Sequence, residues 1–207
     1  PILNVTLEKY ANARVICDDV MRTNLSALVA EVFGADCSSL RVAANLPYYI
    51  TTDVLTKLMR ELPQAKSIAV MIQKEVGDKL LSGPGDDGYG PLAVMCQYRY
   101  HVMRALDVSA ACFNPPPKVD SSFMVLEKLE QPRVNVGDEE IFTRLVRSAF
   151  AMRRKTLLNN LVSGFSLNRE QAAACLAAAN LSAQARAEEL SLEDFAGLAI
   201  QLQNAIR

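Results

Sequence analysis

Histidine and tryptophan are the residues that this chain lacks most clearly. Among its 207 residues there is one histidine and no tryptophan, and its five cysteines are widely spaced. Without a Cys-x-x-Cys pair or a Cys/His cluster, the sequence indicates no metal site. The single histidine argues against a Ser-His-Asp or Cys-His hydrolase unless His101 is its base, and we expect His101 to be structural or to lie on the surface.

Long apolar runs are missing as well. No run approaches the roughly 20 residues that span a bilayer, and the N-terminal sequence PILNVTLEKY does not resemble a signal peptide. The chain is 50% hydrophobic and 22% charged, which is typical of a folded, water-soluble protein. We therefore expect a cytoplasmic protein with no membrane partner, whose cysteines are reduced and packed as small hydrophobic residues.

An excess of positive charge is also missing from the chain as a whole. With 22 basic and 23 acidic residues the net charge is −1, which gives no support to a nucleic-acid partner. The distribution is uneven, however, because residues 141–169 contain no Asp or Glu. The basic residues of this segment are Arg144, Arg147, Arg153, Arg154, Lys155 and Arg169.

The first part of the chain alternates between expected strands and helices. The expected strands are 14–17, 40–44, 67–72, 98–108 and 121–127, and the expected helices are 2–10, 25–33, 51–60, 74–81 and 92–97. This alternation predicts an α/β domain with a mainly parallel sheet. Such sheets bind ligands beyond the carboxyl ends of their strands, where Asp18, Asp19 and residues 45–48 are expected to lie.

After residue 131 the pattern becomes wholly helical. Asp138 can cap a long helix over residues 139–162, and helices over 169–179 and 192–205 are expected to follow. We interpret residues 1–131 as one domain and residues 132–207 as a small all-helical domain. Residues 83–88 fit the pattern G-x-G-x-x-G, but they follow an expected helix and include two aspartates, so we expect a surface loop and no anion site.

The segment Asn45-Leu46-Pro47-Tyr48 has the clearest chemical meaning. The exocyclic amine of adenine is a poor nucleophile because its lone pair is delocalised into the ring. The Asn45 side-chain oxygen and the Leu46 carbonyl can accept both N–H groups and localise that lone pair, while Pro47 fixes the backbone and Tyr48 stacks on the base. Positioning then replaces a general base. Asn and Pro are also common in simple turns, so the motif alone leaves both interpretations open.

Residues 42–50 resemble the catalytic motif of the ribosomal RNA adenine dimethyltransferases, in particular those of the bacterial small-subunit type. Other stretches resemble the same family in the same order, so that the resemblance covers nearly the whole chain. The resembling stretches are 42–50 (VAANLPYYI), 71–76 (MIQKEV), 89–94 (YGPLAV), 113–121 (FNPPPKVDS), 150–161 (FAMRRKTLLNNL) and 188–191 (EELS).

The resemblance implies a Rossmann-like methyltransferase sheet that uses S-adenosylmethionine, followed by a helical RNA-binding domain. Residues 45–48 would be catalytic, with Phe113 as a second aromatic side chain on the target adenine. Asp19 and Asn45 would contact the cofactor. The implied substrate is a pair of adjacent adenosines near the 3′ end of 16S rRNA in the small ribosomal subunit, and we expect a monomer without a metal.

The basic segment fits the RNA-binding role that the resemblance implies. On the long helix expected over residues 139–162, Arg144, Arg147, Arg154 and Lys155 share one face, and the apolar residues lie on another. Together with Arg153, we expect these side chains to contact RNA phosphates. A solvated cationic face is the alternative interpretation.

The chain also departs from the family pattern. The family's first strand, its Gly-rich loop and the acidic residue at the cofactor ribose would all precede residue 1. We therefore expect an N-terminally incomplete sheet, weak cofactor binding and no activity for this chain alone. Pro91 and Ala93 depart from the Y-G-x-L segment. Three alternatives remain: a large-subunit rRNA methylase of the antibiotic-resistance type, a methyltransferase for other adenine or glutamine targets, and a non-catalytic rRNA-binding assembly factor.

Overall fold

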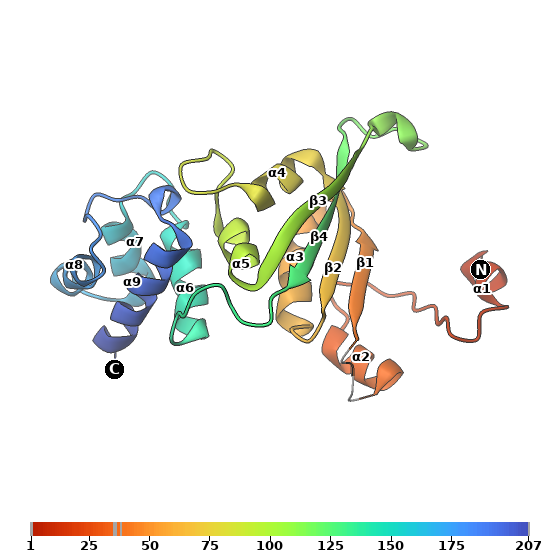
Figure 1. Ribbon diagram of the computed structural model, residues 1–207, viewed down its shortest axis with the longest axis horizontal. Helices are drawn as coiled ribbons and strands as arrows, with labels where there is room; N and C mark the ends of the chain where they lie inside the picture. Colours follow the sequence, from red (N-terminus) through yellow and green to blue (C-terminus); the bar gives the residue numbers. More distant parts are fainter. Residues whose placement is uncertain (1, 35–36, 38, 207) are drawn as a thin grey trace.

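The computed structural model describes residues 2–34, 37 and 39–206, in two parts that lie side by side along the long axis (Figure 1). The first part contains α1 (Ile2–Leu7), α2 (Leu25–Phe33), β1 (Arg41–Asn45), η1 (Tyr48–Ile50), α3 (Thr51–Glu61), β2 (Ser67–Gln73), α4 (Lys74–Leu81), α5 (Pro91–Arg99), β3 (Tyr100–Val108), η2 (Ala110–Cys112) and β4 (Ser121–Lys128). The second part contains α6 (Glu139–Ala149), α7 (Leu157–Phe165), α8 (Arg169–Ala178), η3 (Ala187–Glu189) and α9 (Leu192–Ala205).

The four strands are arranged in the order β1-β2-β4-β3. β1 and β2 are parallel, whereas β4 is antiparallel to both β2 and β3, so the prediction of a mainly parallel sheet is wrong beyond the first pair. The connections explain the difference. Helix α3 carries the chain from β1 to β2, but residues 109–120 join β3 to β4 with only the short turn η2, and a connection without a crossover helix returns the chain antiparallel. The predicted α/β class and the helical second part are confirmed.

Each of the two parts has its own hydrophobic core. In the first core, the apolar face of α3 packs on alternate residues of β2, such as Ile68 and Val70. In the second core, α6 to α9 pack around side chains such as Phe142 and Phe195. Helix α5 belongs to both, because its Cys96 lies in the first core while other residues of the helix lie in the second. Helix α5 therefore connects the sheet to the helical part.

Two predicted elements differ from the structure. Residues 14–17 form no strand, because they are exposed and no strand of the described chain lies beside them to supply hydrogen bonds. The helix predicted over 139–162 is two helices, α6 and α7, separated by residues 150–156, which we call the basic turn. Phe150 and Leu157 are both buried, so the apolar periodicity continues through the break and hides it in the sequence.

The structure confirms the expectations for His101 and Asp138, but not those for all of the cysteines. His101 is exposed on β3, as expected, and Asp138 caps α6 by accepting hydrogen bonds from the N–H groups of the first turn. Cys96 is buried, which raises the pKa of its thiol to about 12. Cys17 and Cys112 are exposed, so the expectation that the cysteines pack as small hydrophobic residues is wrong for these two.

Candidate active site

The candidate active site is the edge of the sheet at which β1, β2 and β3 end and β4 begins. Asn45 is the last residue of β1 and is paired with Met71 of β2. The N–H of Leu46 donates to the Met71 carbonyl at 3.2 Å, which continues the pairing one residue beyond the strand. The predicted position of Asn45 at a strand end is confirmed.

The turn after Asn45 is fixed by its own backbone. Pro47 has φ −59°, and its carbonyl accepts hydrogen bonds from the Ile50 N–H and the Thr51 hydroxyl, both at 3.2 Å. The Leu46 side chain is buried, while Asn45 is exposed. The apolar residue therefore anchors the turn, and the amide of Asn45 remains accessible from outside the sheet.

Tyr48 is held by a residue from a distant part of the chain. Its phenolic oxygen lies 2.8 Å from the hydroxyl oxygen of Ser121, which is fully buried as the first residue of β4. Ser121 is paired with Gln73 on one side and with Val108 on the other. The Tyr48 ring is therefore tied to the centre of the sheet edge. The sequence signal for this contact was the serine that ends the FNPPPKVDS stretch.

Phe113 lies in the loop that joins β3 to β4. This loop extends beyond the end of the sheet at which β3 ends and β4 begins (Figure 1). The Phe113 side chain is half-buried. Asp120 fixes the base of this loop, because its carboxylate accepts the Ala110 N–H at 2.9 Å and its carbonyl accepts the Lys74 N–H at 3.0 Å. The Phe113 loop and the Tyr48 turn therefore lie at the same edge of the sheet. This is consistent with the expectation that both aromatic side chains contact one adenine.

A charged network that the sequence did not reveal lies at this edge. The Asp107 carboxylate accepts a hydrogen bond from Ser122 at 2.5 Å and lies 3.2 Å from the Lys74 ammonium group. The Ser122 hydroxyl, followed by the Lys74 charge, lowers the pKa of Asp107. Lys74 belongs to the MIQKEV stretch, whereas nothing in the sequence marks Asp107. A cleft of about 410 Å³, partly lined by Lys74 and Asp120, opens beside this network.

Asp19 follows residues 14–17, which form no strand in the structure. Its carboxylate accepts the Met21 N–H at 2.9 Å and lies 3.6 Å from the Arg22 guanidinium group. This is the geometry of a turn-forming aspartate. The side chain is 53% exposed, so the carboxylate also has acceptor capacity left for a ligand amino group.

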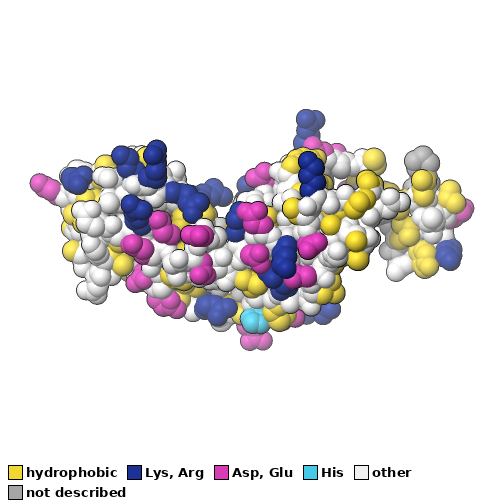
Figure 2. Space-filling view, turned by 90° about the horizontal axis from the view of Figure 1, so that it is seen from above, with side chains coloured by type: hydrophobic (Ala, Val, Ile, Leu, Met, Phe, Trp, Pro, Cys, Tyr) yellow, Lys and Arg dark blue, Asp and Glu magenta, His cyan; other side chains and the backbone are white. Residues whose placement is uncertain are grey.

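The basic residues are distributed over two places. Arg144 and Arg147 are on α6, whereas Arg153, Arg154 and Lys155 are in the exposed basic turn. The single helical face predicted for Arg144, Arg147, Arg154 and Lys155 is therefore wrong, because the helix ends at residue 149. Figure 2 shows Lys and Arg side chains on the helical part and beside the hollow that separates it from the sheet part.

Some of these cations already have protein partners. The Arg144 Nε donates to the Gly164 carbonyl at 3.0 Å, and its guanidinium group lies 4.7 Å from the Phe165 ring centre. Arg153 donates to the Asp87 carbonyl in the glycine-rich loop at 3.3 Å. That loop follows α4 and lies against the helical part, as the Gly85 N–H donates to the Glu188 carbonyl at 2.8 Å.

Asn160 determines the shape of the basic turn and was not identified from the sequence as a functional residue. Its buried amide nitrogen donates to the Ala149 carbonyl at 2.6 Å and to the Met152 carbonyl at 3.4 Å. Both acceptors lie where α6 ends and the turn begins, so one side chain replaces the helical hydrogen bonds lost there. Asn160 lies in the FAMRRKTLLNNL stretch, which is the only sequence signal for it.

The described residues contain no group of three or more His, Cys, Asp or Glu side chains that could hold a metal ion. Within the same residues, every helix is too short or too polar to cross a membrane.

Comparison with known proteins shows the family of the chain. Residues 1–204 match the family model described as ribosomal RNA adenine dimethylase. The chain is 41% identical over 210 residues to the ribosomal RNA small subunit methyltransferase A of Geobacillus thermodenitrificans, covering 100% of this chain and 71% of that protein. The protein of the same name from Clostridium acetobutylicum is 39% identical over 202 residues, covering 98% of this chain and 71% of that protein.

Two solved structures have a similar fold. A dimethyladenosine transferase from Plasmodium falciparum matches with a TM-score of 0.74 and 22% identity, over 98% of this chain and 76% of that one. The 23S rRNA methyltransferase ErmE matches with a TM-score of 0.65 and 20% identity, over 98% of this chain and 77% of that one.

The sheet with its flanking helices and the helical part beside it has the Rossmann-like fold of these two solved structures. The chain belongs to the ribosomal RNA adenine dimethylase family. Enzymes of this family transfer methyl groups from S-adenosylmethionine to adenine in ribosomal RNA.

Proposed function

We propose that this enzyme adds two methyl groups to N6 of two adjacent adenosines near the 3′ end of 16S rRNA, in the small ribosomal subunit during its assembly. The observation that carries the proposal is the Asn45–Tyr48 turn at the sheet edge, with Tyr48 tied to buried Ser121. Relatives that are 39–41% identical to this chain over the aligned residues are named small subunit methyltransferases, which supports this subunit over the large one.

In the proposed mechanism, Asn45 and Leu46 bind the amine that reacts. The Asn45 side-chain oxygen and the Leu46 carbonyl accept one N–H each, which localises the nitrogen lone pair in the direction of the methyl group. Tyr48 and Phe113 pack on the two faces of the adenine ring and hold the base in a position flipped out of the RNA helix. Pro47 has no N–H and a fixed φ, so it keeps the acceptors aimed without any rearrangement.

We propose that Asp19 and Asn45 contact the cofactor. The exposed Asp19 carboxylate can accept the amino group of the cofactor's adenine, and the NH2 of the exposed Asn45 amide can donate to the cofactor while its oxygen accepts from the target adenine. S-adenosylmethionine, when bound, supplies the methyl group.

We assign catalysis and RNA binding to different parts of the fold. Residues 1–131 would form the catalytic domain and residues 132–207 the helical RNA-binding domain. Arg144, Arg147, Arg153, Arg154 and Lys155 would contact RNA phosphates, and the exposed positions of all five support this. We further propose that the enzyme acts as a cytoplasmic monomer without a metal.

The test is transfer of labelled methyl from S-adenosylmethionine to immature small subunits that lack the modification. We expect the chain with the family's N-terminal segment restored to be active, and the Asn45→Ala variant of that protein to lose at least about 100-fold in rate, comparable to removal of one well-placed transition-state contact. Wild-type activity on large-subunit RNA instead would favour the resistance-type methylase. Tight subunit binding without any methylation would favour a non-catalytic assembly factor and refute the proposal.

A further inference from the structure

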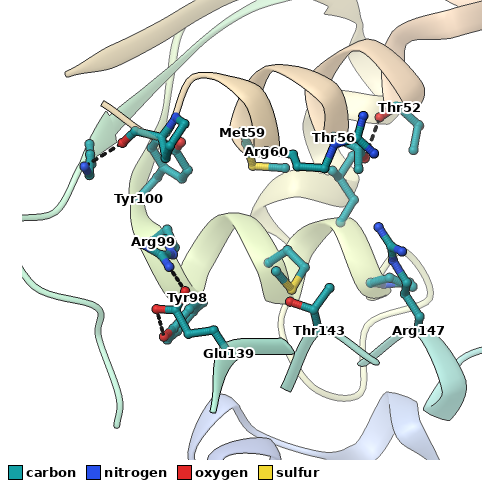
Figure 3. A pocket seen from close by; sticks show the side chains of 15 residues that line it. Thr52, Thr56, Met59, Arg60, Tyr98, Arg99, Tyr100, Glu139, Thr143 and Arg147 are labelled. Carbon is teal, nitrogen blue, oxygen red and sulfur yellow. Dashed lines mark hydrogen bonds and ion pairs between the residues drawn. The ribbon is translucent and has the colours of Figure 1, made fainter. Parts of the chain in front are cut away.

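A cleft of about 400 Å³ lies between α3, α5 and α6, where the sheet part meets the helical part (Figure 3). Its floor is apolar and includes Met59, Leu92 and Met95. This volume falls in the range of sites for small ligands. The cleft is separate from the sheet edge that carries Asn45, and no role described above uses its floor.

The rim of the cleft is strongly positive. The lining contains four cationic side chains and one carboxylate, and these are Arg60, Arg99, Lys128, Arg147 and Glu139. Glu139 is already engaged, because it accepts a hydrogen bond from the Tyr98 hydroxyl at 2.9 Å and forms an ion pair with Arg99. Arg60 is paired as well, because its guanidinium group lies 2.9 Å from the Glu61 carboxylate. Among the described residues, this leaves the Lys128 and Arg147 charges of the lining without a carboxylate partner. A neutral or cationic occupant would leave these two charges uncompensated, so the complementary ligand has an apolar body and a negative charge.

The ends of the cleft connect it to both parts of the proposed RNA surface. Thr52 lies on its wall near the start of α3, just after the turn that holds Tyr48. Figure 3 shows Thr52 and Thr56 on one wall and Arg147 on the opposite wall at the same end. A strand of RNA that contacts Arg147 and delivers an adenine to Tyr48, four positions before Thr52, would therefore run close to this cleft.

We propose that the cleft binds one unpaired nucleotide of the small-subunit RNA, distinct from the methylated adenosines. Its base would pack on Met59, Leu92 and Met95, and its phosphate would lie between Arg60 and Arg147. An unstacked nucleotide supplies both the flat apolar body and the negative charge that the cleft requires. This inference rests on the proposed function, because it assigns part of the same substrate to a second site.

The first test fills the cleft without touching the sheet edge. Thr143 lies on the α6 wall and is half-buried, so Thr143→Trp places an indole in the cleft. We expect KM for immature small subunits to rise by about tenfold or more, the loss that corresponds to one stacked base, with kcat unchanged. The matched control is Ala174→Trp on the exposed face of α8, which should leave KM unchanged.

A second measurement keeps the inference testable if Thr143→Trp unfolds the protein. Wild-type protein is cross-linked by light to immature subunits that contain 4-thiouridine, and the attached peptides are sequenced. We expect nucleotides attached to peptides of α3 or α5 as well as to the basic turn. Cross-links confined to the basic turn would overturn the inference.

The outcomes separate this inference from the proposed function. A wild-type chain that carries the family's N-terminal segment and still methylates no subunit refutes the proposed function. A wild-type protein that methylates, together with a Thr143→Trp variant of unchanged KM, refutes only the nucleotide site. A Thr143→Trp variant that binds naked 16S rRNA normally but binds assembled subunits weakly would assign the cleft to a ribosomal protein and also overturn the inference.

Discussion

The phenolic oxygen of Tyr48 lies 2.8 Å from the hydroxyl oxygen of Ser121, although 73 positions separate the two residues in the chain. Ser121 is fully buried between β2 and β3, so it cannot move without disturbing the sheet. The contact joins the two stretches that carry the proposed aromatic residues, because Ser121 is the last residue of the FNPPPKVDS stretch that begins with Phe113. The orientation of the Tyr48 ring therefore depends on a residue outside its own motif.

The first prediction concerns this contact. Replacing Ser121 by Ala should lower kcat/KM for methyl transfer about 2- to 10-fold, because a single hydrogen bond contributes roughly 0.5–1.5 kcal/mol. Tyr48→Phe removes the same bond from the other side and should have a similar effect. The double variant should then be no slower than the slower single variant. Effects that multiply in the double variant would show that the two hydroxyl groups act independently.

Asn160 gives the second prediction. Asn160→Leu leaves the carbonyls of Ala149 and Met152 without their donor, which should lower the free energy of unfolding by about 1–3 kcal/mol and loosen the basic turn. We also expect weaker binding to 16S rRNA with a shallower salt dependence, because fewer cations would stay in place. Urea unfolding and RNA titrations at several salt concentrations measure the two effects.

The neighbour Asn159 is the control for that experiment. It is only half-buried, and its side chain makes one hydrogen bond, 3.2 Å long, with Arg169. Asn159→Leu should change stability by less than about 0.5 kcal/mol, as is usual for surface positions. Equal effects at the two positions would contradict the scaffold role of Asn160.

Much of the fold could be predicted because local signals and tertiary structure agree. The predicted bounds of α9 are those of the structure, and the capping residue of α6 was identified as Asp138. The position of Asn45 at a strand end followed from an apolar run that stops at a polar residue and a proline. Each of these features is decided within a few residues of the chain.

The features that the sequence did not reveal depend on contacts between distant residues. The break at Phe150 is stabilised by Asn160, and nothing in the spacing of apolar residues marks it. The direction of β4 depends on the length and conformation of the Phe113 loop. The Tyr48–Ser121 contact exists only because β4 lies between β2 and β3, an order that alternation of elements cannot supply.

The third prediction tests the packing of α7 on α6, which positions the basic turn. A Cβ at Gly164 would lie 2.4 Å from the Cβ and Oγ of Ser148, so Gly164→Ala should lower the free energy of unfolding by about 1–3 kcal/mol. The loss should be smaller when Ser148 is also replaced by Gly. Gly197 in α9 is the control, because a Cβ there has no neighbour within 4 Å, and Gly197→Ala should stabilise by about 0.5–1 kcal/mol. Thermal unfolding of the variants checks these signs.

The fourth prediction concerns Glu61 and pH. Its carboxylate accepts hydrogen bonds from Lys57 at 2.7 Å, from Arg60 at 2.9 Å and from the Leu25 N–H at 3.0 Å, so it joins α3 to the start of α2. These bonds, first of all that from Lys57, lower the pKa of Glu61 from 4.5 to about 2. The folded state therefore favours the charged form, and the stabilisation is complete above about pH 4.5 and disappears as the pH falls towards 2.

Glu61→Gln should accordingly lower Tm at pH 7, where it leaves the nearly buried Lys57 ammonium group without its carboxylate. The difference in Tm between wild type and variant should shrink steadily between pH 4.5 and pH 2, because the wild type loses the same charge over that range. Glu75→Gln is the control, since the Glu75–Lys79 pair is exposed and should contribute little at any pH. A Tm difference for Glu61→Gln that stays constant from pH 7 to pH 2 would mean that the Glu61 charge does not stabilise the junction of α2 and α3.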